Sequence, residues 1–154
     1  AGDIISLSRR LLVIAAEDIG LAYPQAISIV KACVDSALQL GLPEARIPLS
    51  EAIILLATAP KSNSAESAID AAIVDLKSCD ALDFPRHLQN KHYDGEGAAI
   101  KGQHYIYPHN YKNHYVKQQY LPDALKDHIY YSFGENKQEQ AALAYRKKII
   151  KESE

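Results

Sequence analysis

The sequence predicts an all-α fold, in which a helical bundle is followed by a long ordered loop region rich in tyrosine and histidine and by a C-terminal helix. Three observations predict it. Apolar residues between positions 4 and 79 recur at three- and four-residue steps, the period of a helix that is buried on one side. Glycine or proline interrupts this period where helices commonly end. All six histidines and eight of the ten tyrosines lie between His87 and Tyr131, after the periodic part.

Two helices are expected in the first 41 residues. The first extends from Ile4 to Ile19, and Gly20 supplies a left-handed residue that ends it. The second begins at Pro24, where a missing amide hydrogen costs nothing, and ends at Gly41. Its side chains expected to face inward are Ile27, Val30, Val34, Ala37 and Leu38. The short connection favours antiparallel neighbours.

Two further helices complete the expected bundle. Pro48 and Pro60 bound the third helix. Its inward stripe is expected to hold Leu49, Ala52, Ile53, Leu56 and Ala57. Polar residues 61–64 offer side-chain oxygens that cap the fourth helix. Its expected stripe comprises Ala65, Ala68, Ile69, Ala72, Ile73 and Leu76. Four amphipathic helices with tight connections are typical of a bundle.

The helical period stops after Phe84-Pro85. Long loops of this kind are usually functional or disordered, but disordered segments contain few aromatic residues. We therefore expect an ordered loop whose tyrosines pack on the bundle, with a short strand around 104–107. Asn136 and Glu139 then have the spacing of a capping box, which predicts that a C-terminal helix begins there.

The composition fits one domain over residues 1–154, comprising an aliphatic bundle (1–80), an aromatic loop-rich part (81–134) and the C-terminal helix (135–154). A charge of -2 and a pI near 6.3 give no global reason to bind nucleic acid. No apolar run approaches the roughly 20 residues that cross a bilayer, so no membrane partner is expected. Two distant cysteines favour a reducing, cytoplasmic location. The lack of methionine indicates a piece of a longer protein.

No catalytic motif is present, and no phosphate-binding loop or nucleophile elbow occurs. Histidines recur at five-residue steps, in the pairs His87 and His92, His104 and His109, and His109 and His114. A five-residue step on a helix places the second ring on a different face, which is wrong for two ligands of one metal. A metal-dependent enzyme that uses these loop histidines is therefore the weakest of the functional hypotheses.

Tyrosines and lysines interleave in the loop, a composition found on surfaces that stack single-stranded nucleic acid. The alternative is that the rings cover the bundle while their hydroxyls reach water or backbone. The candidate surface for DNA or a partner protein comprises Lys101, Tyr105, Tyr107, His109, Lys112 and Lys117.

Glu17 and Asp18 form an acidic pair at the end of the first expected helix. Adjacent helical residues point in different directions, so the two carboxylates cannot easily share a proton. A structural role is favoured, in which they accept hydrogen bonds from a loop or pair with an arginine.

Many short strings in this chain resemble, in order, the C-terminal region of the replication-associated recombination protein A family. The matching strings are Arg9-Arg10, Ala16-Glu17-Asp18-Ile19-Gly20, Pro24-Gln25-Ala26, Gly41, Pro43-Glu44-Ala45-Arg46, Leu56-Ala57, Ala59-Pro60-Lys61-Ser62-Asn63, Ile69-Asp70-Ala71-Ala72, Tyr107-Pro108-His109 and Gln118-Gln119-Tyr120-Leu121-Pro122. The residues carried over as structural family positions are Glu17, Asp18, Gly20, Pro24, Pro60, Lys61, Asn63 and Asp70.

The resemblance implies an AAA+ ATPase of the clamp-loader branch, whose C-terminal helical region resembles the clamp-loader collar and forms homotetramers. It also implies action in replication-fork maintenance, recombination and repair, in a bacterial, nucleoid-associated protein. ATP and Mg²⁺ are expected only in an upstream ATPase module, so no cofactor and no catalysis are expected in this chain. Expected partners are further copies of the chain and, through the full-length protein, DNA and single-stranded-DNA-binding or other replication proteins.

Overall fold

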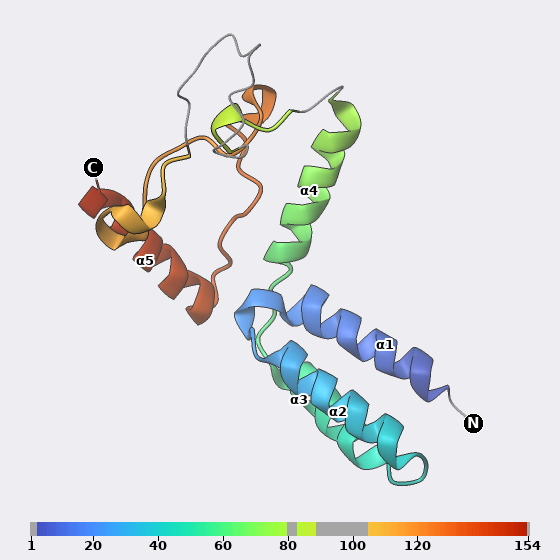
Figure 1. Ribbon diagram of the computed structural model, residues 1–154. Coiled ribbons are helices and arrows are strands. Elements are labelled where there is room, and N and C mark those ends of the chain that lie inside the picture. Colours follow the sequence, from blue (N-terminus) through green and yellow to red (C-terminus); the bar gives the residue numbers. More distant parts are fainter. Residues whose placement is uncertain (1–2, 80–82, 89–104, 154) are drawn as a thin grey trace. The chain divides into compact units, whose positions relative to one another are not determined.

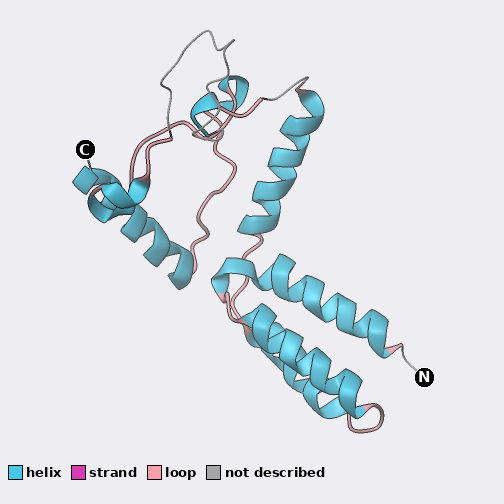
Figure 2. Ribbon diagram, viewed as in Figure 1, coloured by secondary structure: helices cyan, strands magenta, loops and turns pink. Residues whose placement is uncertain are grey.

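The chain is described here by a computed structural model that covers residues 3–79, 83–88 and 105–153. Within these ranges its regular structure is helical and contains no strand, as the sequence predicts (Figure 2). The chain divides into two compact units. The first comprises residues 1–71 and 130–143, and the second comprises 72–129 and 144–154. Among the helices of the described ranges, none has the length and hydropathy of a membrane-spanning segment.

The first helix, α1 (Ile4–Ile14), continues directly into a π-helical turn, Ala15–Ile19. The carboxylate of Asp3 caps α1, because its Oδ1 accepts a hydrogen bond from the amide of Ile5 (3.0 Å). Gly20 follows with a φ of 46°, so the expected helix and its glycine stop are confirmed. The wider π-helical turn was not expected, because the apolar period does not distinguish it from an α-helical turn.

Helices α2 (Ala26–Leu40) and α3 (Arg46–Thr58) follow as expected, with small shifts at their starts. Pro24 precedes the first helical residue of α2 by two positions, and Gly41 ends the helix with a φ of 68°. Pro48 lies in the first turn of α3, where an amide hydrogen has no intrahelical acceptor. The extended Ala59 and then Pro60 end that helix.

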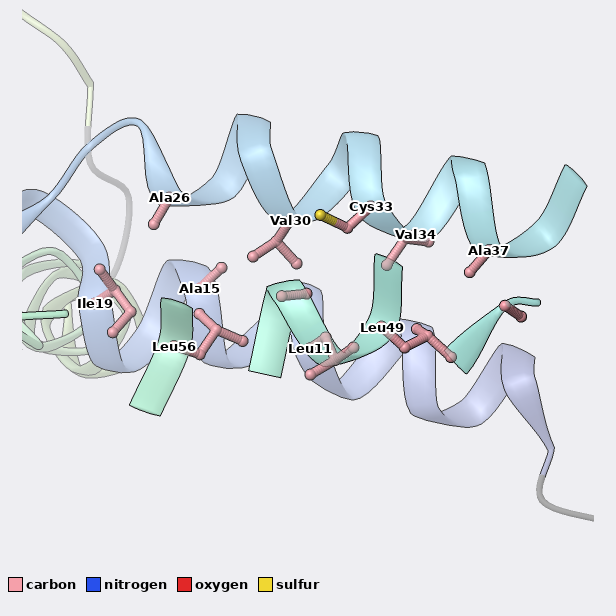
Figure 3. Packing of buried hydrophobic residues seen from close by; sticks show 12 residues of the cluster. Leu11, Ala15, Ile19, Ala26, Val30, Cys33, Val34, Ala37, Leu49 and Leu56 are labelled. Carbon is pink, nitrogen blue, oxygen red and sulfur yellow. The ribbon is translucent and has the colours of Figure 1, made fainter. Parts of the chain in front are cut away.

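The core of the first unit lies between α1, α2 and α3, which pack side by side (Figure 1). Short side chains such as Ala15, Ala26 and Ala37 lie among larger ones, so the three helices approach closely (Figure 3). The buried cluster comprises Leu11, Ala15, Ile19, Ala26, Val30, Cys33, Val34, Ala37, Ala45, Leu49, Ala52 and Leu56.

Several residues expected to face inward lie on the surface instead. Ile27 and Leu38 of α2 and Ile53 and Ala57 of α3 are exposed. The apolar stripe predicted from the sequence period is wider than the face of each helix that its two neighbours cover. These side chains are therefore apolar positions without a partner inside this core.

Helices α4 (Ser64–Ser78) and α5 (Lys137–Ser153) confirm the fourth and C-terminal helices of the sequence prediction. In the second unit, short 3-10 turns lie at Arg86–Leu88, Pro108–Asn110, Lys112–His114 and Asp123–Leu125. The expected short strand is absent from residues 105–107, and its remaining residue, His104, lies outside the described ranges.

Candidate interaction surfaces

The apolar side of α4 is left uncovered by the described residues. The helix forms over the predicted residues, but none of its residues is buried. Ile69 is 57% exposed and Leu76 is 62% exposed, and Ile73 lies between them on the same side of the helix. The expectation that this stripe packs inside the bundle is therefore wrong. A contiguous apolar patch of this kind marks an interaction site more often than a free surface.

An open groove runs between the end of α1 and the first turns of α4. Its apolar lining comes from Val13 and Ile69 and from two alanines, Ala16 and Ala65. Glu17, on the π-helical turn, and Glu66, on α4, add carboxylates to the same groove. The groove thus combines an apolar floor with negative charge.

The carboxylates around this groove repel one another. Partial desolvation raises the pKa of Glu66, and the nearby charges of Glu17, Asp70 and Asp18 raise it further. Within the described ranges, no lysine or arginine forms an ion pair with any of these four residues. The negative charge of these carboxylates therefore favours the binding of a positively charged group in the groove.

Two of the matching sequence strings meet where α1 ends. The amide of Ser62 donates a hydrogen bond to the carbonyl of Asp18 (2.8 Å). A Cβ added to Gly20 would lie 2.6 Å from the Ser62 carbonyl oxygen, so this close approach requires glycine. The contact is made by the backbone of Asp18 and not by its carboxylate. This joins the end of α1 to the connection between α3 and α4.

Other structural family positions lie at helix ends. The Lys61 ammonium donates to the carbonyls of Leu56 (2.7 Å) and Ala59 (2.8 Å) and so caps the end of α3. The Asn63 carbonyl accepts a hydrogen bond from the amide of Ser67 in the first turn of α4 (2.9 Å). Asp70 is exposed on α4.

Glu139 is a buried carboxylate at the start of α5, with only 2% of its surface exposed. Its Oε1 accepts hydrogen bonds from the hydroxyls of Ser64 (2.6 Å) and Tyr131 (2.8 Å) and from the amide of Gly134 (3.0 Å). The Asn136 side-chain amide donates to Oε2, and its Oδ1 accepts from the Glu139 amide (3.0 Å). Asn136 therefore caps α5, as the capping-box spacing predicts.

These contacts decide the charge of Glu139. Burial alone would raise the pKa of this carboxyl, but the hydrogen bonds from Ser62, Ser64, Gly134 and Asn136 outweigh burial and lower it to about 2. Burial and the bond to Glu139 raise the pKa of the Tyr131 phenol. The role of Glu139 as a junction was missed in the sequence, where only its spacing from Asn136 was informative.

The aromatic loop places several of its candidate residues together. The rings of Tyr107 and His109 lie 5.0 Å apart, and those of His109 and His114 lie 4.8 Å apart. The side-chain amide of Gln118 holds the backbone of Ile106, accepting from its amide (3.2 Å) and donating to its carbonyl (2.8 Å). These contacts order the loop around its rings.

The remaining candidate residues in the described part of the loop lie outside this group of rings. Desolvation and then the neighbouring Tyr120 raise the pKa of the Tyr105 phenol. Lys112 and Lys117 are exposed, whereas Lys101 lies outside the described residues. The half-exposed rings of Tyr105 and Tyr107 remain accessible to a ligand in this chain.

The histidines of the described ranges do not converge with other ligands. The ring of His87 bonds the Gln119 carbonyl (2.7 Å), and His128 pairs with Asp75 (2.6 Å). No group of three or more His, Cys, Asp and Glu residues there has a geometry that could hold a metal ion. His92 and His104 lie outside these ranges.

Comparison with known proteins gives a match over nearly the whole chain. The family model described as "MgsA AAA+ ATPase C terminal" matches residues 1–150. Replication-associated recombination protein A of Bacillus subtilis is 50% identical over 143 residues, which cover 93% of this chain and 34% of the relative. The protein of the same name from Escherichia coli K12 is 35% identical, over 84% of this chain and 29% of the relative.

A eukaryotic protein is also similar. ATPase WRNIP1 of Dictyostelium discoideum is 29% identical over 81% of this chain and 14% of its own length. The chain therefore spans about a third or less of the length of these relatives.

Proposed function

Because this chain belongs to the MgsA AAA+ ATPase C-terminal family, we propose that it assembles identical subunits of an AAA+ ATPase of replication-associated recombination, as a homotetramer. In this proposal the chain itself performs no catalysis. ATP and Mg²⁺ belong to an upstream ATPase module, and the helical chain takes the part of a clamp-loader collar.

The observation that carries the proposal is the uncovered apolar side of α4. Ile69, Ile73 and Leu76 are exposed along a 15-residue helix that has no buried residue. Fully burying an exposed large aliphatic side chain is worth about 1.5–3 kcal/mol. These three side chains are 38% to 62% exposed, so covering them in every subunit gains part of that amount at each position. Identical subunits offer this patch to one another in closed symmetric assemblies, the commonest arrangement of soluble oligomers.

Assembly would act in the parent protein by bringing the ATPase modules of its subunits close together. Subunits held together keep their ATPase modules at high local concentration and in a fixed orientation, so that one module can complete the site of its neighbour. Several modules can then engage one DNA structure together. DNA and replication proteins would be partners of the full-length protein in this arrangement.

Light scattering of the purified chain tests the proposal. A mass near four subunits is expected at micromolar concentration, together with a fall in mass for Ile73→Asp combined with Leu76→Asp. The matched control is Ser67→Asp, an exposed position on α4 away from the apolar side. Circular dichroism checks that each variant keeps its helices. A monomeric mass for the unchanged chain at all concentrations overturns the proposal.

A second candidate function is the binding of single-stranded DNA by the aromatic loop. The adjacent, exposed rings of Tyr107 and His109 and the exposed Lys112 favour it, because stacking and positive charge together bind nucleic acid without sequence readout. Oligonucleotide binding that weakens with salt and is lost in Tyr107→Ala with Lys112→Ala would support it. Lys126→Ala is the control. If the Tyr107→Ala, Lys112→Ala variant binds the oligonucleotide as well as the Lys126→Ala control does, this loop is excluded as the DNA-binding surface.

A further inference from the structure

The groove between the end of α1 and the first turns of α4 favours an occupant that is both apolar and cationic. Val13 and Ile69 are large apolar residues left exposed in its lining. Glu17 and Glu66 add negative charge beside them, and no cation of the described ranges neutralises either one. An apolar ligand without charge would cover these carboxylates at a cost in desolvation, whereas a cationic one would compensate them.

The second half of α5 has the complementary chemistry. Tyr145 and Ile149 lie one turn apart on one side of the helix, and Arg146 lies at the border of that side, about 60° around the helix from Ile149. Tyr145 is 63% exposed, and Arg146 is exposed. Lys148 flanks this side, and Lys147 and Lys151 add positive charge elsewhere around the helix. The segment therefore has an apolar side with positive charge at its border.

We propose that residues 144–153 of α5 from a second copy of this chain dock in the groove lined by Val13, Glu17, Glu66 and Ile69. Tyr145 and Ile149 cover the apolar floor, and Arg146 faces the two carboxylates. The inference rests on the proposed self-assembly and names one of its interfaces.

A second copy suits this groove because the chain carries both halves of the contact. In a two-fold symmetric pair the groove of each subunit receives the α5 segment of the other, so every contact is made twice. Ten residues of α-helix measure about 15 Å, roughly three turns, which is long enough to present Tyr145 and Ile149 together with Arg146. Opposite charges across the interface also fix which surfaces meet.

A charge exchange between two variants tests this contact. The groove variant carries Glu17→Lys and Glu66→Lys, and the helix variant carries Arg146→Glu and Lys148→Glu. Each variant alone places like charges in every groove, so its association is expected to weaken about tenfold or more, and its mass by light scattering to fall. In a one-to-one mixture, each groove can meet a helix of opposite charge. The mixture is expected to recover the mass of the unchanged chain.

The control variant carries Glu44→Lys and Asp127→Lys, which changes the net charge as much as the groove variant does, at exposed positions outside the groove and α5. It should keep the full mass. The inference is overturned if either charge variant alone keeps the full mass, or if the mixture does not regain it. Such results leave self-assembly intact when the unchanged chain is still oligomeric. A monomeric unchanged chain instead refutes the proposed function, and the inference with it.

Discussion

The hydroxyl of Ser64 donates a hydrogen bond to Oε1 of Glu139 at 2.6 Å, although 75 positions separate the two residues in the sequence. Ser64 is the first residue of α4, and Glu139 lies in the first turn of α5. The bond therefore ties the starts of two helices together. Since the same Oε1 also accepts from Tyr131 and Gly134, one carboxylate holds the segment before α5 against the start of α4.

Glu139→Gln is expected to destabilise the chain by about 2–4 kcal/mol, because the change replaces a charged acceptor and leaves buried donors without a good partner. The new side-chain amide would also face the donating Nδ2 of Asn136. Urea unfolding measures the loss. Glu135→Gln, at an exposed position close by, should change the stability by less than about 0.5 kcal/mol. Equal stabilities for the two variants would contradict the junction role.

The carboxylate of Glu139 also makes the stability of the chain depend on pH. The pKa of Glu139 is about 2 in the folded chain, below the ordinary value of 4.5, so the unfolded chain binds the proton more readily. The contribution to stability is complete above pH 4.5 and is lost as the pH falls towards 2. It amounts to about 3 kcal/mol at neutral pH. The difference in unfolding free energy between the unchanged chain and Glu139→Gln should therefore shrink as the pH falls through this interval. A difference that stays constant with pH would contradict the predicted contribution of the Glu139 carboxylate.

Local patterns in the sequence were sufficient for the helices and their ends. Gly20, Gly41, Pro60 and Asn136 act within a few residues of the ends that they mark, so their roles follow from local backbone chemistry. The π-helical turn could not be predicted, because α- and π-helical turns leave the same apolar residues on one side over so short a stretch.

The surfaces were harder to predict, because they depend on what lies beside each helix. A helical period shows that Ile69, Ile73 and Leu76 share one side of α4, but it does not show what covers that side. The groove needs the end of α1 to lie next to the first turns of α4, and the burial of Glu139 needs donors from segments far away in the sequence. The rings of Tyr107 and His109 were predicted as candidates because composition alone identified the loop.

Gly20→Ala should destabilise the chain more than Gly41→Ala. Both glycines have positive φ, which costs any other residue about 1–2 kcal/mol. At Gly20 a Cβ would also press on the Ser62 carbonyl oxygen at 2.6 Å, whereas at Gly41 nothing lies within 4 Å. The extra loss at Gly20 thus measures the contact between the end of α1 and the α3–α4 connection. Equal losses in thermal unfolding would show that this connection moves aside freely.

Ser8→Ala is expected to stabilise the chain. Within the described ranges the hydroxyl of Ser8 is buried in α1 and has no hydrogen-bond partner. A buried hydroxyl without a partner costs about 1–3 kcal/mol, and alanine is also the better helix former. A gain of about 1 kcal/mol should raise the melting temperature by about 3 °C in a chain of this size.

Ser36→Ala separates the loss of the buried hydroxyl from the general benefit of alanine in a helix. The Ser36 hydroxyl is exposed on α2 and donates to the Ala32 carbonyl (2.9 Å), so its removal relieves no buried polar group. A gain limited to helix propensity, about 0.5 kcal/mol, is expected there. A larger gain at Ser8 than at Ser36 therefore assigns the difference to burial. Equal gains would instead mean that Ser8 meets a partner in solution, as it would if water or a second subunit reached this side of α1.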